Sequence, residues 1–281
     1  MKKLLAMMLA VVMAVACLSL ASCNNSTNND ATTKTTAADE SDFSYISNKG
    51  ELVIGVTEFK PMNYKDDKGE WTGFETEFAQ AVCQGLGVKA KFQIIDWDSK
   101  VTELQSKNID VIWNGMTVTE ELGKSIDFSK SYIKNMQVVV ISKANAAKFK
   151  SVKDLETANL VCEKGSAGEK AIKDDASLSK ATTTPVGKQA DALLEVKSGT
   201  ADAAVLDYVM AKKMVGDGSD YSDLQMIDGV ELSSEEYAVG IRKGSDLKAK
   251  IDEQIDALIK NGKLNEIAEK YDLKDSLLSN Q

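Results

Sequence analysis

Two short polar segments follow apolar runs and are suited to bind a charged solute. A Gly-Ser-Ala-Gly segment at 165–168 comes after the apolar residues 160–162, and Asp207 directly follows the run 203–206. Both segments stand at the carboxyl ends of apolar runs, where open α/β sheets bind their ligands. Both features also occur at ordinary helix starts that bind no ligand. Glu163, close to the first segment, adds another negative charge.

Reactive chemistry is restricted by what the sequence lacks. The chain has no histidine, which removes Ser-His-Asp and Cys-His mechanisms and the usual histidine-bearing zinc sites. Glu163 is the only obvious acid–base candidate for an enzyme, and no clear second carboxylate accompanies it. We therefore expect no catalytic residue, no metal and no cofactor.

The segments that would position these groups alternate between strand and helix. The predicted strands are residues 52–56, 91–95, 109–113, 160–162, 182–186 and 203–206, and the predicted helices include residues 74–86, 99–106 and 189–197. Alternation at this spacing indicates mainly parallel α/β sheets.

The two halves repeat the same order of elements. Residues 103–115 and 195–207 can be laid on each other, and each runs helix, turn, Asp, strand, so that Gly115 and Asp207 fall at equivalent positions. A generic helix-turn-strand unit can occur twice in any α/β protein, but the paired first strands favour two lobes of similar build.

The chain is expected to cross between the lobes twice. A long apolar strand at 137–141 would carry it from lobe 1 to lobe 2, residues 237–241 would carry it back, and helices between 247 and 271 would complete lobe 1. The predicted division is residues 43–134 plus 237–281 for lobe 1 and residues 135–236 for lobe 2.

One cleft should collect the polar strand ends. In open α/β sheets ligands bind beyond the carboxyl ends of the strands, so residues 57–59, 114–117, 165–168 and Asp207 would face each other. Trp97 lies in the polar run Asp-Trp-Asp and is therefore harder to explain as core than Trp113 in mid-strand, and Trp71 is expected to cover a surface turn.

Residues 1–22 are typical of a secretory leader. Two lysines precede the apolar run 4–20, and small residues stand directly before Cys23. The run is slightly short for a membrane helix, which needs about 20 apolar residues. The end of the leader, Leu-Ala-Ser-Cys, resembles the bacterial lipobox, so a lipid anchor that includes palmitate is expected on Cys23. The alternative is an ordinary secretory leader with an incidental cysteine. After the lipidated cysteine, residues up to 42 hold no large apolar side chain, so 23–42 should form a disordered tether.

Charge and cysteine content exclude further classes. The formal net charge is −9, and it becomes −11 once the two lysines leave with the leader. A chain with this much negative charge is not expected to bind nucleic acid or anionic lipid headgroups. Cys83 and Cys162 fall in different predicted lobes and read as small buried hydrophobes without a disulfide.

Four stretches, weak singly but specific in their order and spacing, are similar to the amino-acid branch of bacterial periplasmic solute-binding proteins, extracellular solute-binding family 3. They are Gly69-Glu-Trp-Thr-Gly-Phe-Glu75, Gly115-Met-Thr-Val-Thr119 running on to Ile126-Asp-Phe-Ser129, Ser198-Gly-Thr-Ala-Asp202 and Asn261-Gly-Lys-Leu-Asn-Glu-Ile267. The resemblance covers nearly all of 50–271. It implies an α/β, two-lobed fold of the periplasmic-binding-protein-like type II, each lobe a mainly parallel sheet flanked by helices, joined by two crossover strands.

The resemblance also carries ligand contacts onto this chain. Phe59 and Trp97 fall where the family places aromatic or apolar groups against the ligand. Gly115 and Thr117 match a loop that offers backbone groups and a hydroxyl. Ser166 and Ala167 match the carboxylate-binding loop, and Asp207 matches the acid that binds the α-ammonium group. Asn114 is added to these expected contacts because it lies at a strand end, and Glu163 because it is a charged residue beside the loop. Thr57 lies near an acidic contact of the family but cannot supply the charge.

Leu122 is the departure that matters. The family has an arginine there that clamps the α-carboxylate, and leucine offers no donor. Three readings stay open: another cation such as Lys124 or Lys188 substitutes, Ser166 with Thr117 and backbone amides suffices, or the solute is an amine without an α-carboxylate. An amine would place its cation on Asp207 and the face of Trp97.

The expected function is that of a receptor lipoprotein of an ABC importer. It would capture an amino acid or related amine between two closing lobes and deliver it to a permease, as a monomer held to the outer face of the cytoplasmic membrane by its lipid alone. An exported dehydratase-like enzyme on the same scaffold and a sensory solute-binding module are the alternatives.

Overall fold

The computed structural model describes residues 41–281, which belong to one compact unit. The predicted leader, Cys23 and most of the predicted tether lie outside the described residues. Within the described part of the chain no helix is long and apolar enough to span a bilayer.

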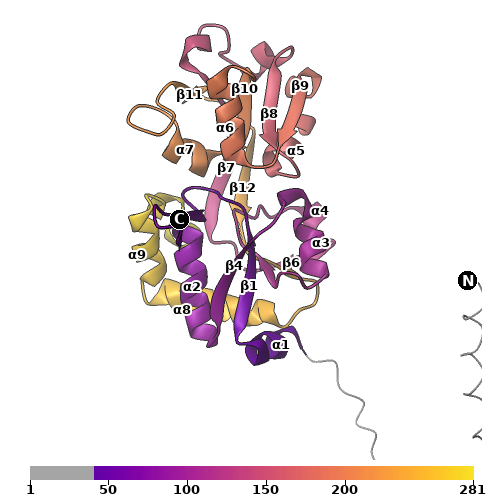
Figure 1. The fold of residues 1–281 in the computed structure, drawn as a ribbon, viewed down its shortest axis with the longest axis vertical. Helices are drawn as coiled ribbons and strands as arrows, with labels where there is room; N and C mark the ends of the chain where they lie inside the picture. The colour runs from indigo at the N-terminus through magenta and orange to yellow at the C-terminus, as the bar shows by residue number, and fades with distance from the viewer. Residues whose placement is uncertain (1–40) are drawn as a thin grey trace, which may run out of the picture. The chain divides into compact units, whose positions relative to one another are not determined.

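The first sheet holds five strands in the order β4-β1-β5-β13-β6. Their bounds are β1 Glu51–Val56, β4 Lys89–Ile94, β5 Val111–Ile112, β6 Ile126–Phe128 and β13 Gly240–Arg242. β1 pairs in parallel with β4 and β5, while β13 runs antiparallel to β5 and β6. We call this sheet and the helices around it lobe 1 (Figure 1).

The helices of lobe 1 come from both ends of the described chain. They are α1 Asp42–Lys49, α2 Phe74–Leu86, α3 Lys100–Gln105, α4 Glu120–Gly123, α8 Leu247–Lys260 and α9 Lys263–Lys270, with a hairpin of β2 Tyr64–Lys65 and β3 Trp71–Thr72. α2 buries Phe74, Phe78 and Val82 at helical spacing and packs against α8 and α9. It begins after Gly73, where φ is 116° and a Cβ would stand 2.2 Å from the carbonyl oxygen of Met62, so only glycine fits.

The second sheet, which with its helices we call lobe 2, has the order β11-β7-β10-β8-β9, with β12 paired to β7. The strands are β7 Ile133–Ser142, β8 Asn159–Glu163, β9 Thr182–Val186, β10 Ala203–Asp207, β11 Leu224–Met226 and β12 Ser233–Tyr237, and the helices are α5 Ala167–Asp174, α6 Gln189–Ser198 and α7 Tyr208–Met214. β8 runs parallel to β9 and β10, whereas β7 is antiparallel to β10. Short 3₁₀ turns lie at Trp97–Ser99, Lys143–Asn145, Val152–Leu155, Leu178–Lys180, Lys274–Ser276 and Leu278–Asn280.

A two-stranded ribbon connects the lobes. Residues 133–137 of β7 pair with residues 233–237 of β12, and Figure 1 shows both strands running between the two sheets. The C-terminal segment braces this ribbon, because Leu277 bridges to Ile133 and the backbone N–H of Leu278 donates to the carbonyl of Tyr132 at 3.1 Å.

The two aspartates of the repeated sequence segment do the same work in each lobe. The side chain of Asp110 accepts from the backbone N–H of Val53 at 2.8 Å, and that of Asp202 accepts from the N–H of Asn159 at 2.9 Å. Each therefore ties the turn before a strand (β5 or β10) to the start of the neighbouring parallel strand. This equivalence supports the reading of the repeat as two lobes of similar build.

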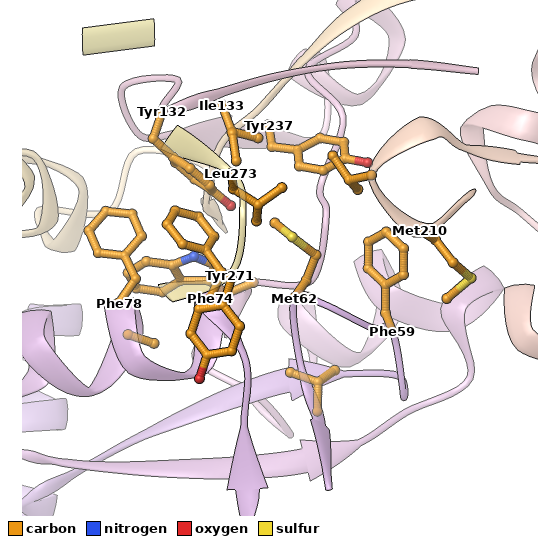
Figure 2. Packing of buried hydrophobic residues seen from close by; sticks show 14 of the residues in the cluster. Phe59, Met62, Phe74, Phe78, Tyr132, Ile133, Met210, Tyr237, Tyr271 and Leu273 are labelled. Carbon is orange, nitrogen blue, oxygen red and sulfur yellow. The ribbon is translucent and has the colours of Figure 1, made fainter. Parts of the chain in front are cut away.

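Aromatic rings fill the core of lobe 1. The ring of Phe78 meets the rings of Trp113 and Tyr132 edge-on, with centroids 5.1 and 5.2 Å apart. Figure 2 shows Phe74, Phe78 and Tyr132 grouped together, with Ile133 next to Tyr132 at the start of the connecting ribbon. Trp113 is thus core, as expected, while Trp71 packs on Phe92 at the surface.

The predicted two-lobed α/β fold is confirmed, with two local corrections. Neither predicted crossing has the expected bounds: residues 137–141 pair with β10 inside the second sheet, and residues 240–241 pair with β5 and β6 inside the first. The crossings are residues 133–137 and 233–237 of the ribbon. The predicted tether also ends earlier than residue 42. The Ser41 hydroxyl accepts from the N–H of Ser44, and Asp42 opens α1 in an ion pair 2.8 Å from Nε of Arg242. Cys83 and Cys162 are buried free thiols, as expected.

Candidate binding cleft

A cavity of about 550 Å³ lies between the lobes. All nine residues singled out from the sequence line it: Phe59, Trp97, Asn114, Gly115, Thr117, Glu163, Ser166, Ala167 and Asp207. Leu122 lines it as well. The rule that strand ends converge on one site therefore placed all of them together except Trp97 and Glu163, which were singled out on other grounds. The part of all nine in binding a solute stays a prediction.

On the side of lobe 1, Asn114 fixes the loops at the ends of β1 and β5. Its Oδ1 accepts from the backbone N–H and the hydroxyl of Thr57, at 3.0 and 2.8 Å, and its Nδ2 donates to the Thr57 carbonyl at 3.0 Å. The hydroxyl of Thr57 is thus committed to Asn114, which agrees with the weak sequence case for Thr57 as a ligand contact. Asn114 holds the cavity wall in place.

Gly115 lines the cavity at a position where only glycine fits. Its φ is 57°, and a Cβ would stand 2.5 Å from Cε1 of Phe59. Its backbone N–H donates to both carboxylate oxygens of Glu75, at 3.1 and 2.8 Å. That N–H is consequently not offered to a solute, which corrects the expectation that Gly115 contributes free backbone donors.

Glu75, on α2, is a buried carboxylate that the sequence reasoning missed as a supporting residue. The hydroxyl of Tyr132 also donates to it. Burial raises the pKa of Glu75 to about 7, against the lowering effect of the Tyr132 and Gly115 hydrogen bonds, and the charge of Asp207 raises it further. Glu75 therefore holds the Gly115 loop through a group that titrates near neutral pH.

On the side of lobe 2, Ser166 caps α5. Its hydroxyl oxygen accepts from the backbone N–H of Glu169 at 3.1 Å, so the ordinary reading of this serine as a helix cap is realised. The same hydroxyl keeps its proton as a donor, and the first N–H groups of α5, from Ala167 onward, stand at the cavity. The segment can thus meet an anion while it caps the helix.

Asp207 ends β10 as a buried acceptor. Its Oδ1 accepts from the side chains of Asn135, Gln137 and Tyr237, and its Oδ2 accepts from Gln189. Although it precedes α7, its side chain makes no capping bond to that helix. The plain helix-cap reading of Asp207 is therefore wrong, and four neutral donors stabilise a carboxylate at the cavity wall.

Glu235 lies next to this carboxylate. It accepts from the same amides, those of Asn135 and Gln137. Burial raises the pKa of Glu235 to about 8, and the charge of Asp207 raises it further. Neither Glu235 nor the amides were expected from the sequence, because the pairing of β7 with β10 and with β12 brings them to Asp207.

Trp97 and Lys100 form the edge of the cavity that approaches lobe 2. The Nζ of Lys100 lies 4.7 Å from the centroid of the Trp97 ring and donates to the carbonyls of Trp97 and Gly165, at 3.1 and 2.9 Å. Burial lowers the pKa of Lys100 to about 8. The sequence reasoning offered Lys124 and Lys188 as replacement cations, but neither is among the residues that line the cavity; Lys188 pairs with Glu58 at 3.3 Å.

Three contacts join the lobes beside the cavity. Nζ of Lys164 lies 2.6 Å from Oδ2 of Asp98, the Lys188–Glu58 pair spans the lobes, and Lys100 reaches Gly165. Gly165 approaches lobe 1 so closely that a Cβ would stand 2.7 Å from Cα of Asp98. The cleft is therefore closed on this side by direct contact between lobes.

Comparisons with known proteins agree with this geometry. Residues 52–274 match the family model described as bacterial extracellular solute-binding proteins, family 3. The L-cystine-binding protein TcyJ of Escherichia coli (strain K12) is 29% identical over 239 residues, which cover 83% of this chain and 87% of the relative. The arginine-binding extracellular protein ArtP of Bacillus subtilis (strain 168) is 29% identical over 239 residues, 84% of this chain and 91% of the relative. The crystal structure of AncCDT-1, an ancestral amino acid-binding protein and precursor of cyclohexadienyl dehydratase, is 31% identical, with a TM-score of 0.74 over 82% of this chain and 98% of that one.

Proposed function

The chain belongs to the bacterial extracellular solute-binding proteins, family 3, and from that premise we propose that it captures an amino acid between its lobes and delivers it to an ABC permease. The environment of Asp207 is the observation that best supports an amino acid as the solute. Four neutral side-chain donors hold this buried carboxylate at the cavity wall, and no lysine or arginine pairs with it among residues 41–281. A carboxylate kept in this way is ready to receive the α-ammonium group of a solute.

The carboxylate of the solute finds donors on the same side of the cleft. Ser166 and the first N–H groups of α5 lie on the wall that also holds Asp207, and Thr117 faces them from lobe 1. These groups replace the arginine that Leu122 removes. Lys124 and Lys188 lose support as substitutes because neither lines the cavity. An amine without a carboxylate remains the rival solute class.

Solute capture requires that the closed arrangement be favoured by contacts from both lobes. Phe59 and Trp97 belong to lobe 1, while Asp207 and Ser166 belong to lobe 2. A solute that touches both sets binds the closed form better than the open form, and only that difference in affinity shifts the equilibrium. We further propose that the protein acts as a monomer, exported and held to the membrane by a lipid on Cys23.

An exported enzyme is the second candidate, since AncCDT-1 is by name a precursor of a dehydratase. The group on which such chemistry would depend is Glu163, which lines the cavity at the end of β8 and has a raised pKa of about 8. Turnover of a bound solute, lost in Glu163→Gln with binding kept, would favour this candidate. Binding without turnover favours the receptor.

A thermal-shift panel tests the proposal. The purified protein is unfolded and refolded to remove carried-over solute, then heated with L-amino acids and with their decarboxylated amines. A solute at 100 times its Kd adds about 2.7 kcal/mol to the free energy of unfolding. Stabilisation by amino acids but not by their amines supports the proposal. Stabilisation by amines alone replaces the ligand class, and no stabilisation by either contradicts the proposal.

A further inference from the structure

Two buried titratable side chains in the cleft, one basic and one acidic, are not explained by the binding of a simple amino-acid head. Lys100 comes from lobe 1 and is 7% exposed, and Glu163 comes from lobe 2 and is 3% exposed. Both line the cavity. Burial lowers the pKa of Lys100 to about 8, and burial with the charge of Asp207 raises the pKa of Glu163 to about 8, while each of the two groups favours the charged form of the other. Within residues 41–281 they make no ion pair, in contrast to the neighbouring pair Lys164–Asp98 at 2.6 Å.

Each member of this pair keeps a free hydrogen-bonding position. The ammonium group of Lys100 has three N–H donors, and two of them reach the carbonyls of Trp97 and Gly165. The Oε1 atom of Glu163 is buried and has no hydrogen-bond partner in the described part of the chain. A spare donor and a spare acceptor thus line the same cavity from opposite lobes.

A buried polar group without a partner is costly, and a buried charge more so. A solute end with only donors, such as a guanidinium or a second ammonium, would satisfy Glu163 but repel Lys100. An end with only acceptors, such as a lone carboxylate, would satisfy Lys100 but leave the Oε1 atom of Glu163 without a donor. A group that presents an oxygen acceptor and an N–H donor together satisfies both.

We propose that Lys100 and Glu163 form a second subsite in the cleft, next to the start of α5, that selects solutes whose other end carries both an oxygen acceptor and an N–H donor. This bipolar end is either a carboxamide or a second amino-acid head. The inference rests on the proposed function, because Asp207 and the start of α5 must hold the first head of the solute. The cavity of about 550 Å³ has room for the longer solutes that carry two heads.

Calorimetric titration of the refolded, solute-free protein tests the subsite with four solutes. L-Glutamine represents the carboxamide end, L-cystine the second amino-acid head, L-arginine the cationic end and L-glutamate the anionic end. The wild-type protein is expected to bind L-glutamine or L-cystine about 10- to 100-fold more tightly than L-arginine or L-glutamate, the range for one hydrogen bond to a charged group. Which of the first two binds more tightly distinguishes the two bipolar ends.

Two substitutions, each of which removes one titratable group, isolate the two contributions. In Lys100→Met, Glu163 is left alone, so the preference for the bipolar solute over L-arginine should shrink about tenfold or reverse. In Glu163→Gln, the same shift should occur towards L-glutamate. The double variant should lose both preferences. Lys164→Met is the matched control: this lysine, next to Glu163 in sequence, is exposed and lies outside the cavity lining, so it should leave the ranking of the four solutes unchanged.

Melting temperatures of the variants without solute show that each is folded before its ranking is used. The inference is overturned if the wild-type protein binds L-arginine or L-glutamate as tightly as the bipolar solutes, or if Lys100→Met and Glu163→Gln leave the ranking unchanged while amino acids still bind. In either of these cases the proposed function stands. If the wild-type protein binds no amino acid at all, the proposed function and the inference fall together.

Discussion

Replacing Glu75 by glutamine should flatten the dependence of stability on pH. Burial raises the pKa of Glu75 from the ordinary value of 4.5 to about 7, so the folded protein keeps this proton over a pH range in which the unfolded chain has lost it. The unfolded state then binds fewer protons than the folded state, and the free energy of unfolding falls as pH rises from about 4.5 to about 7. Above that window both states are ionised and the whole cost is present.

The size of this effect follows from the shift. One pKa unit corresponds to about 1.4 kcal/mol, so burial of the ionised carboxylate costs on the order of 3 kcal/mol above pH 7, of which about 2–3 kcal/mol develops between pH 5 and pH 8. Glu75→Gln removes the ionisation. Its loss of hydrogen bonds with Tyr132 and Gly115 does not vary with pH, so the variant gains about 2–3 kcal/mol relative to the wild type over that range.

Urea unfolding of both proteins at pH 5, 6, 7 and 8 measures this difference. Other buried acids, Glu163 and Glu235, also titrate in the wild type, and comparison with the variant cancels their contributions as long as Glu75→Gln leaves them unchanged. Glu253→Gln, on the exposed face of α8, is the control and should show no such trend. A stability difference between wild type and Glu75→Gln that stays constant from pH 5 to pH 8 would refute the reasoning.

Three further changes test other parts of the cleft. Leu122→Arg restores a bidentate donor at the cavity wall and should tighten binding of α-amino acids by about 10- to 100-fold without tightening their decarboxylated amines; an equal gain for both classes in a calorimetric titration would contradict this. Gly115→Ala forces a side chain into a positive φ and against Phe59, so it should lower the free energy of unfolding by about 1–2 kcal/mol in urea, and an unchanged midpoint would argue against the strain. Asp98→Asn removes an ion pair whose lysine is largely exposed, so solute affinity should change less than about fivefold; a larger loss would mean that this pair controls closure.

The sequence located the cleft because strand order and strand ends are written in local patterns. Asp207 and Ser166 each follow an apolar run, and parallel strands deliver their carboxyl ends to one edge of a sheet. Gly115 was found for the same reason, and its positive φ explains why glycine stands there. Asp110 and Asp202 recur because each lobe needs the same tie between a turn and a neighbouring strand.

The contacts of the cleft that the sequence did not reveal depend on strand register and on burial by distant parts of the chain. Lys100 looks like any solvent-facing lysine at the start of a short helix, but in the structure it contacts Trp97 and, across the cleft, Gly165 of the other lobe. Glu235 reaches Asp207 through strand pairing, and Gln189 reaches it from the start of α6; no local sequence pattern encodes either contact. Glu75 sits in a recognisable stretch, yet its contact with Gly115 joins residues 40 apart. The start of α1 was missed because its helix has few apolar residues, and Arg242, far along the chain, holds Asp42.

The central claim is that the cleft binds an amino acid through Asp207, and calorimetric titration of the refolded, solute-free wild type and its Asp207→Asn variant tests it most directly. The account predicts tight, one-to-one binding of an L-amino acid by the wild type. It also predicts a loss of about 3–5 kcal/mol, several hundredfold or more in affinity, in the variant. Equal affinity in the two folded proteins, or no binding of any amino acid by the wild type, would contradict it.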